Sequence, residues 1–239
     1  MLIAYLIAGA LAAAPVTDLD PAPPSDFAGL VAVMTEGRPE ARAALDRLAV
    51  DMLKTGEVEP GWNANAFDFA GWLERQGANA SSHVLYDDSD GMRAITSLDG
   101  PFDIQPLPYR YAIIGDVDAA GDQEQSLQRL GEGIYLNYRG DGALNGSAMC
   151  SVDGAAEIMA TRPPGDWSSA DWQMVLAVGA FVEQAQARAI CTVYGESAQG
   201  RLTERFYTKE GASYELLNDA AAPWRLRPRV EALQDFFAD

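Results

Sequence analysis

The chain has 239 residues, of which 48% are hydrophobic and 22% charged, and these are ordinary values for a globular protein. Its formal charge is −18, because 35 acidic residues outnumber 17 basic ones, and only Lys54 and Lys209 are lysines. A surface this acidic repels phosphate backbones, which excludes nucleic acid as a partner, and the apolar content excludes a disordered chain.

Residues 1–14 form an apolar run that ends in small residues, a pattern typical of a secretory signal peptide and too short for a comfortable membrane span. The run carries no Lys or Arg, and Pro15 disfavours cleavage after Ala14, so cleavage after Ala12 is preferred. Residues 15–25 hold several prolines and predict a stiff, extended linker. We therefore expect an exported protein, periplasmic or secreted, with no membrane span after cleavage. An uncleaved N-terminal anchor is the alternative.

Export would place the two cysteines, Cys150 and Cys191, in an oxidising compartment. An even pair in an oxidising compartment predicts a disulfide, which would close a loop of roughly 40 residues and stabilise the fold by about 4 kcal/mol. Two free, buried thiols are the alternative. With one histidine and no closely spaced cysteines, the sequence predicts no catalytic thiol, no metal site and no cofactor.

The first part of the folded chain, residues 26–77, is predicted to be helical. An apolar stripe predicts a helix over 26–35, capped by Ser25 or Asp26. A second helix is predicted over 39–54, with Pro39 in its first turn, and a third over 65–76, ending at Gly77.

The remaining part, residues 78–239, is predicted to be mixed. Its longest predicted element is a helix from Ser168 to Tyr194, which begins with a capping box between Ser168 and Asp171 and carries Cys191 near its end. Within it, residues 174–181 have no polar side chain and are expected to be enclosed on all sides. The other predicted elements are a hairpin of 83–86 with 92–97, strands at 109–114 and 133–139, a pair of 147–152 with 156–160, a hairpin of 202–208 with 213–218, and a last helix over 230–237.

Helices followed by strands, with one long helix between the strands, predict an α+β fold. We expect a single domain over 26–239, with a mainly antiparallel sheet packed on the long central helix.

Several short segments resemble functional motifs but lack residues that those motifs require. Gly195–Gly200 lacks the second glycine of a nucleophile elbow, since Gln199 stands in its place, and its expected preceding element is a helix instead of a strand. The acidic turns at 87–90 and 116–121 lack the ligand positions of a calcium loop. His83 is interpreted as a strand-end surface residue, with a catalytic base as the alternative.

Arginines are concentrated near the C-terminus. Residues 201–239 hold six basic and seven acidic residues, whereas residues 1–200 hold 11 and 28. Arginines close to aromatic side chains suit an anionic ligand or an acidic protein surface, and the alternative is internal ion pairing. The candidate ligand-binding residues are Arg201, Arg205, Arg225 and Arg227.

These observations favour an exported, non-enzymatic protein that binds a partner or ligand. The alternative is an extracytoplasmic hydrolase built on carboxylates, which would need two acids of perturbed pKa facing each other in a pocket.

Overall fold

The computed structural model describes residues 24, 26–35, 43–44, 47, 67–88, 93–140, 148–150, 154–187, 190–196, 202–210, 213–218 and 224–238. The side chains of 148–150, 190–192, 203–210 and 213–218 are outside this description. The predicted signal peptide and linker also lie outside it, apart from Pro24. So does most of the predicted second helix, of which Ala43, Ala44 and Arg47 are described and helical.

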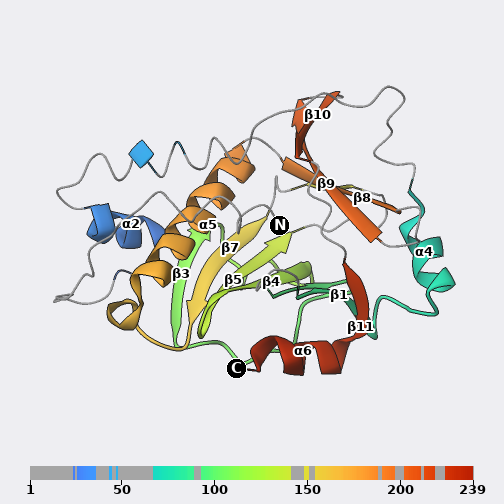
Figure 1. Cartoon of the computed structure of the whole chain (residues 1–239), viewed down its shortest axis with the longest axis horizontal. Helices are drawn as coiled ribbons and strands as arrows, with labels where there is room; N and C mark the ends of the chain where they lie inside the picture. The colour runs from blue at the N-terminus through green and yellow to red at the C-terminus, as the bar shows by residue number, and fades with distance from the viewer. Residues whose placement is uncertain are drawn as a thin grey trace.

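The fold is α+β, built on two antiparallel sheets (Figure 1). The large sheet contains, in spatial order, β11 (Arg225–Pro228), β1 (His83–Asp87), β2 (Ala94–Ser97), β4 (Glu124–Gly131), β5 (Ile134–Gly140), β7 (Ala155–Ala160) and β3 (Tyr109–Ile114). The small sheet contains β10 (Ser213–Asn218), β9 (Leu202–Glu210), β8 (Ile190–Glu196) and β6 (Ala148–Cys150). The described helices are α2 (Phe27–Thr35), α4 (Phe69–Arg75), α5 (Ser169–Ala187) and α6 (Arg229–Phe237).

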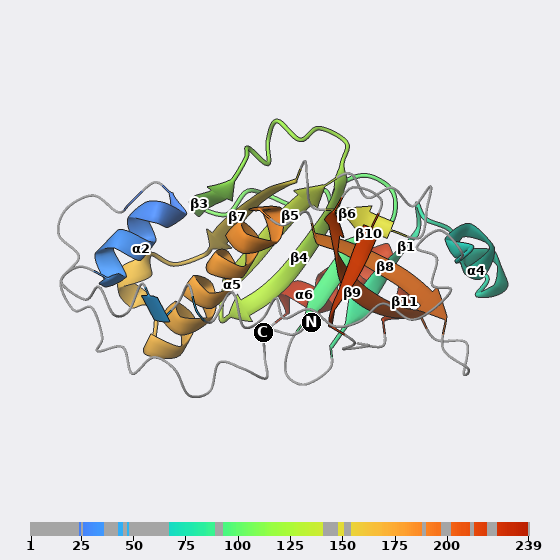
Figure 2. The same ribbon diagram turned by 90° about the horizontal axis from the view of Figure 1, so that it is seen from above.

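Helices cover the large sheet on both faces, as the two ribbon views show (Figures 1 and 2). Successive side chains of a strand point to opposite faces. On β5 and β7, Leu136 and Ile158 accordingly pack in one core cluster with α5 and α2, and Tyr135 and Met159 pack in another with α6. The expectation of one central helix beneath a sheet is therefore too simple. Among the described helices, none is long and apolar enough to cross a bilayer.

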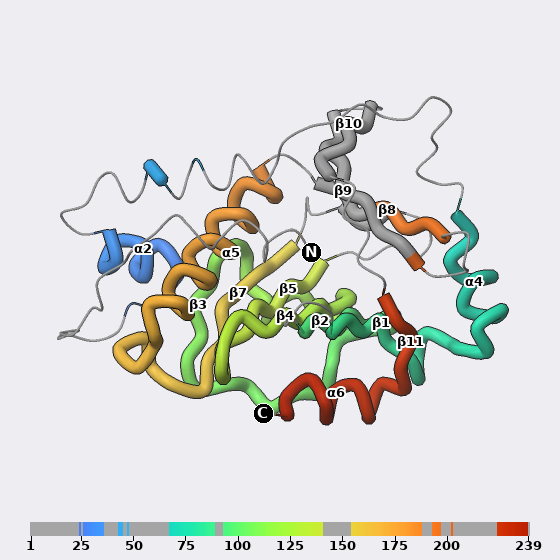
Figure 3. The backbone as a smooth tube through the Cα atoms, in the orientation of Figure 1, coloured from blue at the N-terminus to red at the C-terminus, as the bar shows by residue number. Residues whose placement is uncertain are grey.

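The small sheet lies beyond the end of α5, toward the part of the large sheet that contains β1 (Figure 1). The tube in Figure 3 shows α4 beyond β1, at the opposite end of the molecule from α2. A third core cluster joins them, because Leu85 of β1 packs with Tyr194 of β8, Leu202 of β9 and the aromatic residues of α4. An isolated antiparallel bridge between Leu202 and Trp224 also links the start of β9 to the residue before β11.

Several predicted elements are confirmed. Helix α2 begins where expected, and Asp26 caps it by accepting a hydrogen bond from Gly29 N at 2.7 Å. Helix α4 begins four residues later than predicted, after its cap Asp68, and it ends as predicted just before Gly77, whose φ of 68° is left-handed and suits glycine. The strands β1, β2, β3, β5, β9 and β10 and the helix α6 all occupy the predicted segments within one to two residues at most ends.

The predicted helix Ser168–Tyr194 is wrong in its last part. Helix α5 ends at Ala187, and Ile190–Glu196 forms strand β8, so that Cys191 lies on a strand. Residues 190–194 include isoleucine, threonine, valine and tyrosine, which favour strands over helices, and this preference is satisfied by pairing with β6 and β9.

The predicted pairing of 147–152 with 156–160 is also wrong. Strand β6 pairs with β8 in the small sheet, whereas both edges of β7 are occupied by β5 and β3 in the large sheet. Strands β4 and β11 were not predicted from the sequence.

Candidate functional site

A row of buried polar side chains crosses the α6-side face of the large sheet. Gln125, Asn137 and Glu157 are only 1%, 3% and 4% exposed, on β4, β5 and β7. Gln125 Nε2 donates to Asn137 Oδ1 at 2.6 Å, and Asn137 Nδ2 donates to Glu157 Oε1 at 2.8 Å. At the inner end, Gln125 N donates to Ser97 Oγ at 2.7 Å, and Gln125 Oε1 accepts from Phe102 N at 2.8 Å. Burying a polar group costs free energy unless the group forms hydrogen bonds, and here each buried side chain is hydrogen-bonded to its neighbour in the row.

The outer end of this row is Arg110 on β3. Its Nε donates to Glu157 Oε2 at 2.8 Å, and its Nη1 and Nη2 donate to the two oxygens of Asp118, both at 2.9 Å. The side chains of Glu157, Arg110 and Asp118 are 5%, 30% and 69% exposed, so the row runs from the interior to solvent. Hydrogen bonds to Asp118, and then to Glu157, raise the pKa of Arg110. The hydrogen bond from Arg110 lowers the pKa of Asp118, and the charge of Arg139 lowers it further.

Arg139 on β5 is the second cation near Asp118. Its Nη1 donates to the carbonyl of Gly121 at 3.3 Å, whereas its Nε is buried without a hydrogen-bond partner. Two carboxylates thus share one guanidinium, with a second guanidinium close by. The carboxylates can orient a cation and the guanidinium groups can bind an anion. Because both carboxylates accept hydrogen bonds from Arg110, the arrangement offers no group for moving a proton.

Glu124, at the start of β4, is a carboxyl of a different kind. Burial, and then the charge of Asp99, raise its pKa to about 8, and its Oε2 atom is buried without a hydrogen-bond partner. A carboxyl that keeps its proton near neutral pH has the property required of a general acid. Asp99 is exposed and supplies the only neighbouring carboxylate that affects this pKa among the described residues.

The predicted ligand-binding arginines fall on two segments that meet at the bridge between Leu202 and Trp224, from which β9 and β11 run in opposite directions. Arg205 lies on β9 and Arg225 and Arg227 on β11, while Arg201 and the side chain of Arg205 are outside the described residues. Arg225 forms an ion pair with Asp88 at 3.4 Å and remains 65% exposed. Arg227 donates to Asp235 at 2.6 Å and lies over the ring of Tyr86, and the hydrogen bond to Asp235 raises the pKa of Arg227.

All ten arginines with described side chains bind acceptors of the protein itself. Some pair with carboxylates, and others donate to backbone carbonyls, as Arg229 does to Asp99 O at 2.8 Å. The ten are Arg47, Arg75, Arg93, Arg110, Arg129, Arg139, Arg162, Arg225, Arg227 and Arg229. In the described part of the chain, positive charge is therefore used to hold the fold, and much of the acidic excess stays on the surface.

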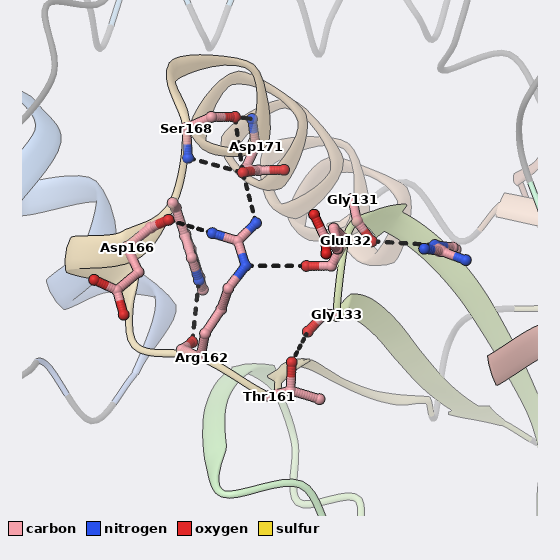
Figure 4. Close-up of polar contacts among 10 residues, drawn as sticks. Gly131, Glu132, Gly133, Thr161, Arg162, Asp166, Ser168 and Asp171 are labelled. Carbon is pink, nitrogen blue, oxygen red and sulfur yellow. Dashed lines mark hydrogen bonds and ion pairs between the residues drawn. The ribbon is translucent and has the colours of Figure 1, made fainter. Parts of the chain in front are cut away.

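Figure 4 shows one of these networks, around Arg162. Its guanidinium donates to Asp171 Oδ2 at 2.8 Å, to Glu132 O at 3.1 Å and to Asp166 O. The predicted capping box is confirmed at the same place. Ser168 Oγ accepts from Asp171 N at 3.2 Å, and Ser168 N donates to Asp171 Oδ2 at 2.8 Å. These contacts fix the start of α5 to the β4–β5 turn, which is a structural task.

The other residues and motifs noted in the sequence are His83, the acidic turns and the segment Gly195–Gly200. His83 Nδ1 lies 2.9 Å from Ser82 Oγ at the start of β1, and Asp116 Oδ1 accepts from Asp118 N at 2.9 Å in an acidic turn. The described residues contain no group of three or more His, Cys, Asp or Glu side chains able to hold a metal ion. The segment before Gly195–Gly200 is strand β8 and not a helix, although Gln199 still breaks the elbow pattern.

The two cysteines lie on paired strands. In the register of β6 and β8, Cys150 is directly opposite Cys191. No disulfide is seen among the side chains that the structure describes, and these include neither cysteine.

Comparison with known protein families, with curated proteins and with solved structures finds no match for this chain.

Sequence reasoning did not identify the polar row. One signal was present, since Glu157 interrupts the otherwise apolar strand Ala155–Ala160, and a lone charge in such a strand requires a partner. The partners come from β3, β4 and β5, and the strand order that joins them could not be read from the sequence.

Proposed function

We propose that the chain is an exported protein, periplasmic or secreted, that binds a partner or an anionic ligand and does not catalyse a reaction. The apolar N-terminus and the proline-containing linker support export. The register of Cys150 and Cys191 supports it too, because directly opposed residues of antiparallel strands have Cα atoms about 4.5–5.5 Å apart, within the span of a disulfide. We expect this pair to be bonded in the mature protein.

Export and the disulfide are tested together on protein made with its own N-terminus and recovered from the periplasm of a bacterial host. Intact mass after alkylation should show no modified thiol without reductant and two with it. The mature chain should begin after residue 12 or 14. Two alkylated thiols without reductant would rule out the disulfide, and a chain that starts at Met1 would indicate an uncleaved anchor.

The observation that carries the binding proposal is the bridge between Leu202 and Trp224. This bridge brings the start of β9, at Leu202, alongside Trp224, the residue before β11, although they are more than 20 residues apart in the chain. Arg225 is largely exposed, and its ion pair with Asp88 is a surface contact of small energy that an anionic group can replace. We assign the junction of the two sheets as the binding surface, with Arg201, Arg205, Arg225 and Arg227 as contacts.

A fluorescein-labelled hexaglutamate peptide is a suitable probe of this surface, read by anisotropy at low salt. Arg225→Glu should weaken binding by more than about tenfold, because it replaces one charge-assisted contact with a repulsion. Arg47→Glu makes the same charge change on an exposed helical residue far from the junction in sequence, and should leave binding within about twofold. Equal losses in both variants, or no binding by the wild type, would contradict the assignment.

A second candidate function, a carboxylate-based hydrolase, is favoured by one observation. Glu124, with a pKa of about 8, could act as general acid, with Asp99 as the second carboxylate. Chromogenic glycosides of several sugars provide the test. Turnover by the wild type that falls at least ~100-fold in Glu124→Gln would support the hydrolase, and absence of turnover would leave the binding function.

A further inference from the structure

Asp118 is held in an unusual way for a residue of an exposed turn. Its two oxygens accept from Nη1 and Nη2 of Arg110, both at 2.9 Å, which is the paired geometry in which arginine recognises a free carboxylate. Yet its side chain is 69% exposed. The exposed carboxylate is screened by solvent, and its paired geometry on Arg110 is also the geometry in which a carboxylate from outside the chain would bind.

The side of Arg110 that faces the interior is held by buried polar side chains, whose removal from water costs much more free energy than the exposed contact with Asp118. Glu157 holds Nε and Nη2, at 2.8 and 3.2 Å, and Asn137 and Gln125 extend that support through the buried row. Burying these polar groups costs free energy that only their mutual hydrogen bonds offset. The result is a guanidinium with a fixed orientation, whose outer edge faces solvent. Such a supporting shell is the usual means of preparing an arginine for a ligand.

The turn that carries Asp118 has few other attachments. It lies between Gly115 and Gly121, which have φ of 60° and 61°, conformations that glycine adopts at no steric cost. Its backbone N–H groups donate within the turn: Ala119 N to Asp116 O at 3.2 Å, Gln123 N to Ala120 O at 3.4 Å, and Asp118 N to the Asp116 side chain at 2.9 Å. Beyond these, Val117 is buried at 5% exposure, and Arg139 binds Gly121 O. Asp118 can therefore leave Arg110 by a local change of the turn.

Removing Asp118 would give this group of charges a net positive charge. With it, Arg110 and Arg139 are balanced by Glu157 and Asp118, whereas without it two cations face one buried anion. The buried Nε of Arg139, which has no hydrogen-bond partner, supplies a donor that the present contacts leave unused. An incoming anion thus finds a prepared arginine, a net positive charge and a second donor.

We propose that Asp118 occupies a site on Arg110 at which an external carboxylate binds. When the turn moves and Asp118 leaves Arg110, the protein binds at this site the carboxylate of a small organic acid or of a peptide C-terminus. The site is separate from the surface at the junction of the two sheets, and neither assignment depends on the other. The intramolecular carboxylate lowers the apparent affinity, because the free site exists only in the fraction of molecules in which the turn is open.

The test compares wild type, Asp118→Ala and Asp122→Ala as full mature proteins, with acetate as the probe and sodium chloride at equal ionic strength as the reference. Asp122 is an exposed acid directly after this turn, so its variant makes the same change in charge. Binding is followed through the side-chain N–H signals of Arg110 and Arg139 in NMR spectra. Asp118→Ala should bind acetate about tenfold or more tightly than wild type, whereas Asp122→Ala should match wild type.

A second set of probes identifies the source of the carboxylate. Acetyl-triglycine with a free C-terminus is compared with its amide, and only the free acid should shift the two arginine signals. Binding of acetate but not of the peptide would assign small acids, and binding of both would include peptide C-termini.

The inference is overturned if folded Asp118→Ala gains no acetate binding, or if Asp122→Ala gains as much. Should Asp118→Ala fail to fold, Asp118→Asn keeps the shape of the side chain without its charge and is subject to the same criteria. Adding Arg139→Gln to the Asp118 variant that binds acetate more tightly should remove most of the gain in acetate affinity, while the midpoint of thermal unfolding changes by only a few degrees. A gain that survives this change would place the anion elsewhere and also contradict the inference.

Discussion

Gly179, in the middle of α5, lies against the aromatic ring of Phe27 from α2. A β-carbon added at Gly179 would overlap three ring carbons of Phe27, closer than real atoms approach. Both residues are buried, and Phe27, which is 1% exposed, belongs to the core cluster that α2 and α5 share with the large sheet. The glycine therefore allows the two helices to pack closely, at the cost of a lower helix propensity.

We expect Gly179→Ala to destabilise the protein by about 1–3 kcal/mol, because the new methyl group would force the buried ring of Phe27 to shift within the core. Helix propensity alone would give the opposite sign, a gain of roughly 1 kcal/mol. The free energy of unfolding is measured by urea melts. Gly165→Ala is the matched control, since a β-carbon there would meet nothing within 4 Å.

A double variant separates this overlap from other causes. In the background of Phe27→Leu, which shortens the facing side chain, Gly179→Ala should cost less than it does in the wild type, giving a coupling energy of about 0.5–2 kcal/mol. Additive effects of the two changes would show that Phe27 is not the obstacle.

The contacts of Asp171 give a second prediction. Burial opposes ionisation, but hydrogen bonds from Arg162 and Ser168 outweigh it and lower the pKa of Asp171. A depressed folded pKa means that the stabilisation is present above the unfolded pKa of about 3.8 and is lost as pH falls through the folded value. Asp171→Asn should therefore cost about 2–4 kcal/mol at pH 7 and less at pH 3, in urea melts at both values.

Asp166→Asn is the control for that experiment. It makes the same charge change next to Arg162, but Arg162 binds the backbone carbonyl of Asp166, which the substitution keeps. A comparable loss in the control at pH 7 would mean that net charge, and not the clamp around Arg162, causes the effect.

Glu124 gives a pH dependence of the opposite sign. Its folded pKa of about 8 lies above the unfolded value of 4.5, so the folded state holds the proton more tightly. The free energy of unfolding should then fall as pH rises from about 4.5 to about 8. Because Glu124 is only partly buried, we expect Glu124→Gln to be more stable than wild type by about 1–3 kcal/mol at pH 8.5 and nearly equal at pH 5.

The exposed Asp122→Asn controls for the general relief of repulsion in a chain of charge −18. If its gain at pH 8.5 equals that of Glu124→Gln, the carboxyl of Glu124 is ionised in the folded protein at neutral pH.

The elements that the sequence predicts well are those with local signals. Asp26 before an apolar stripe, Gly77 after one, and Ser168 with Asp171 each specify a helix end through contacts within a few residues. Strand β3 was predicted at its observed bounds for the same reason, because its run of tyrosine and isoleucine is flanked by proline and glycine.

What could not be predicted depends on pairing between distant segments. Strand β4 contains polar residues whose burial makes sense only beside β2 and β5, as with Gln125, which is 1% exposed. The tail of the predicted long helix became β8 because strands β6 and β9 were there to pair with it. The polar row required the order β2–β4–β5–β7–β3, and the basic residues near the C-terminus required the bridge from Leu202 to Trp224.

Helix α5 itself provides the last prediction. Residues 175–180 are all buried, while Met174 and Phe181 are partly buried against the same cluster, close to the enclosure that their apolar run predicts. Leu176, 4% exposed, should leave a cavity when replaced by alanine and cost about 2–5 kcal/mol. Gln184, on the half-buried stretch of the same helix, should change stability by less than about 0.5 kcal/mol when replaced by alanine. Urea melts of both variants measure the difference, and similar small losses would mean that α5 lies on the surface of the protein.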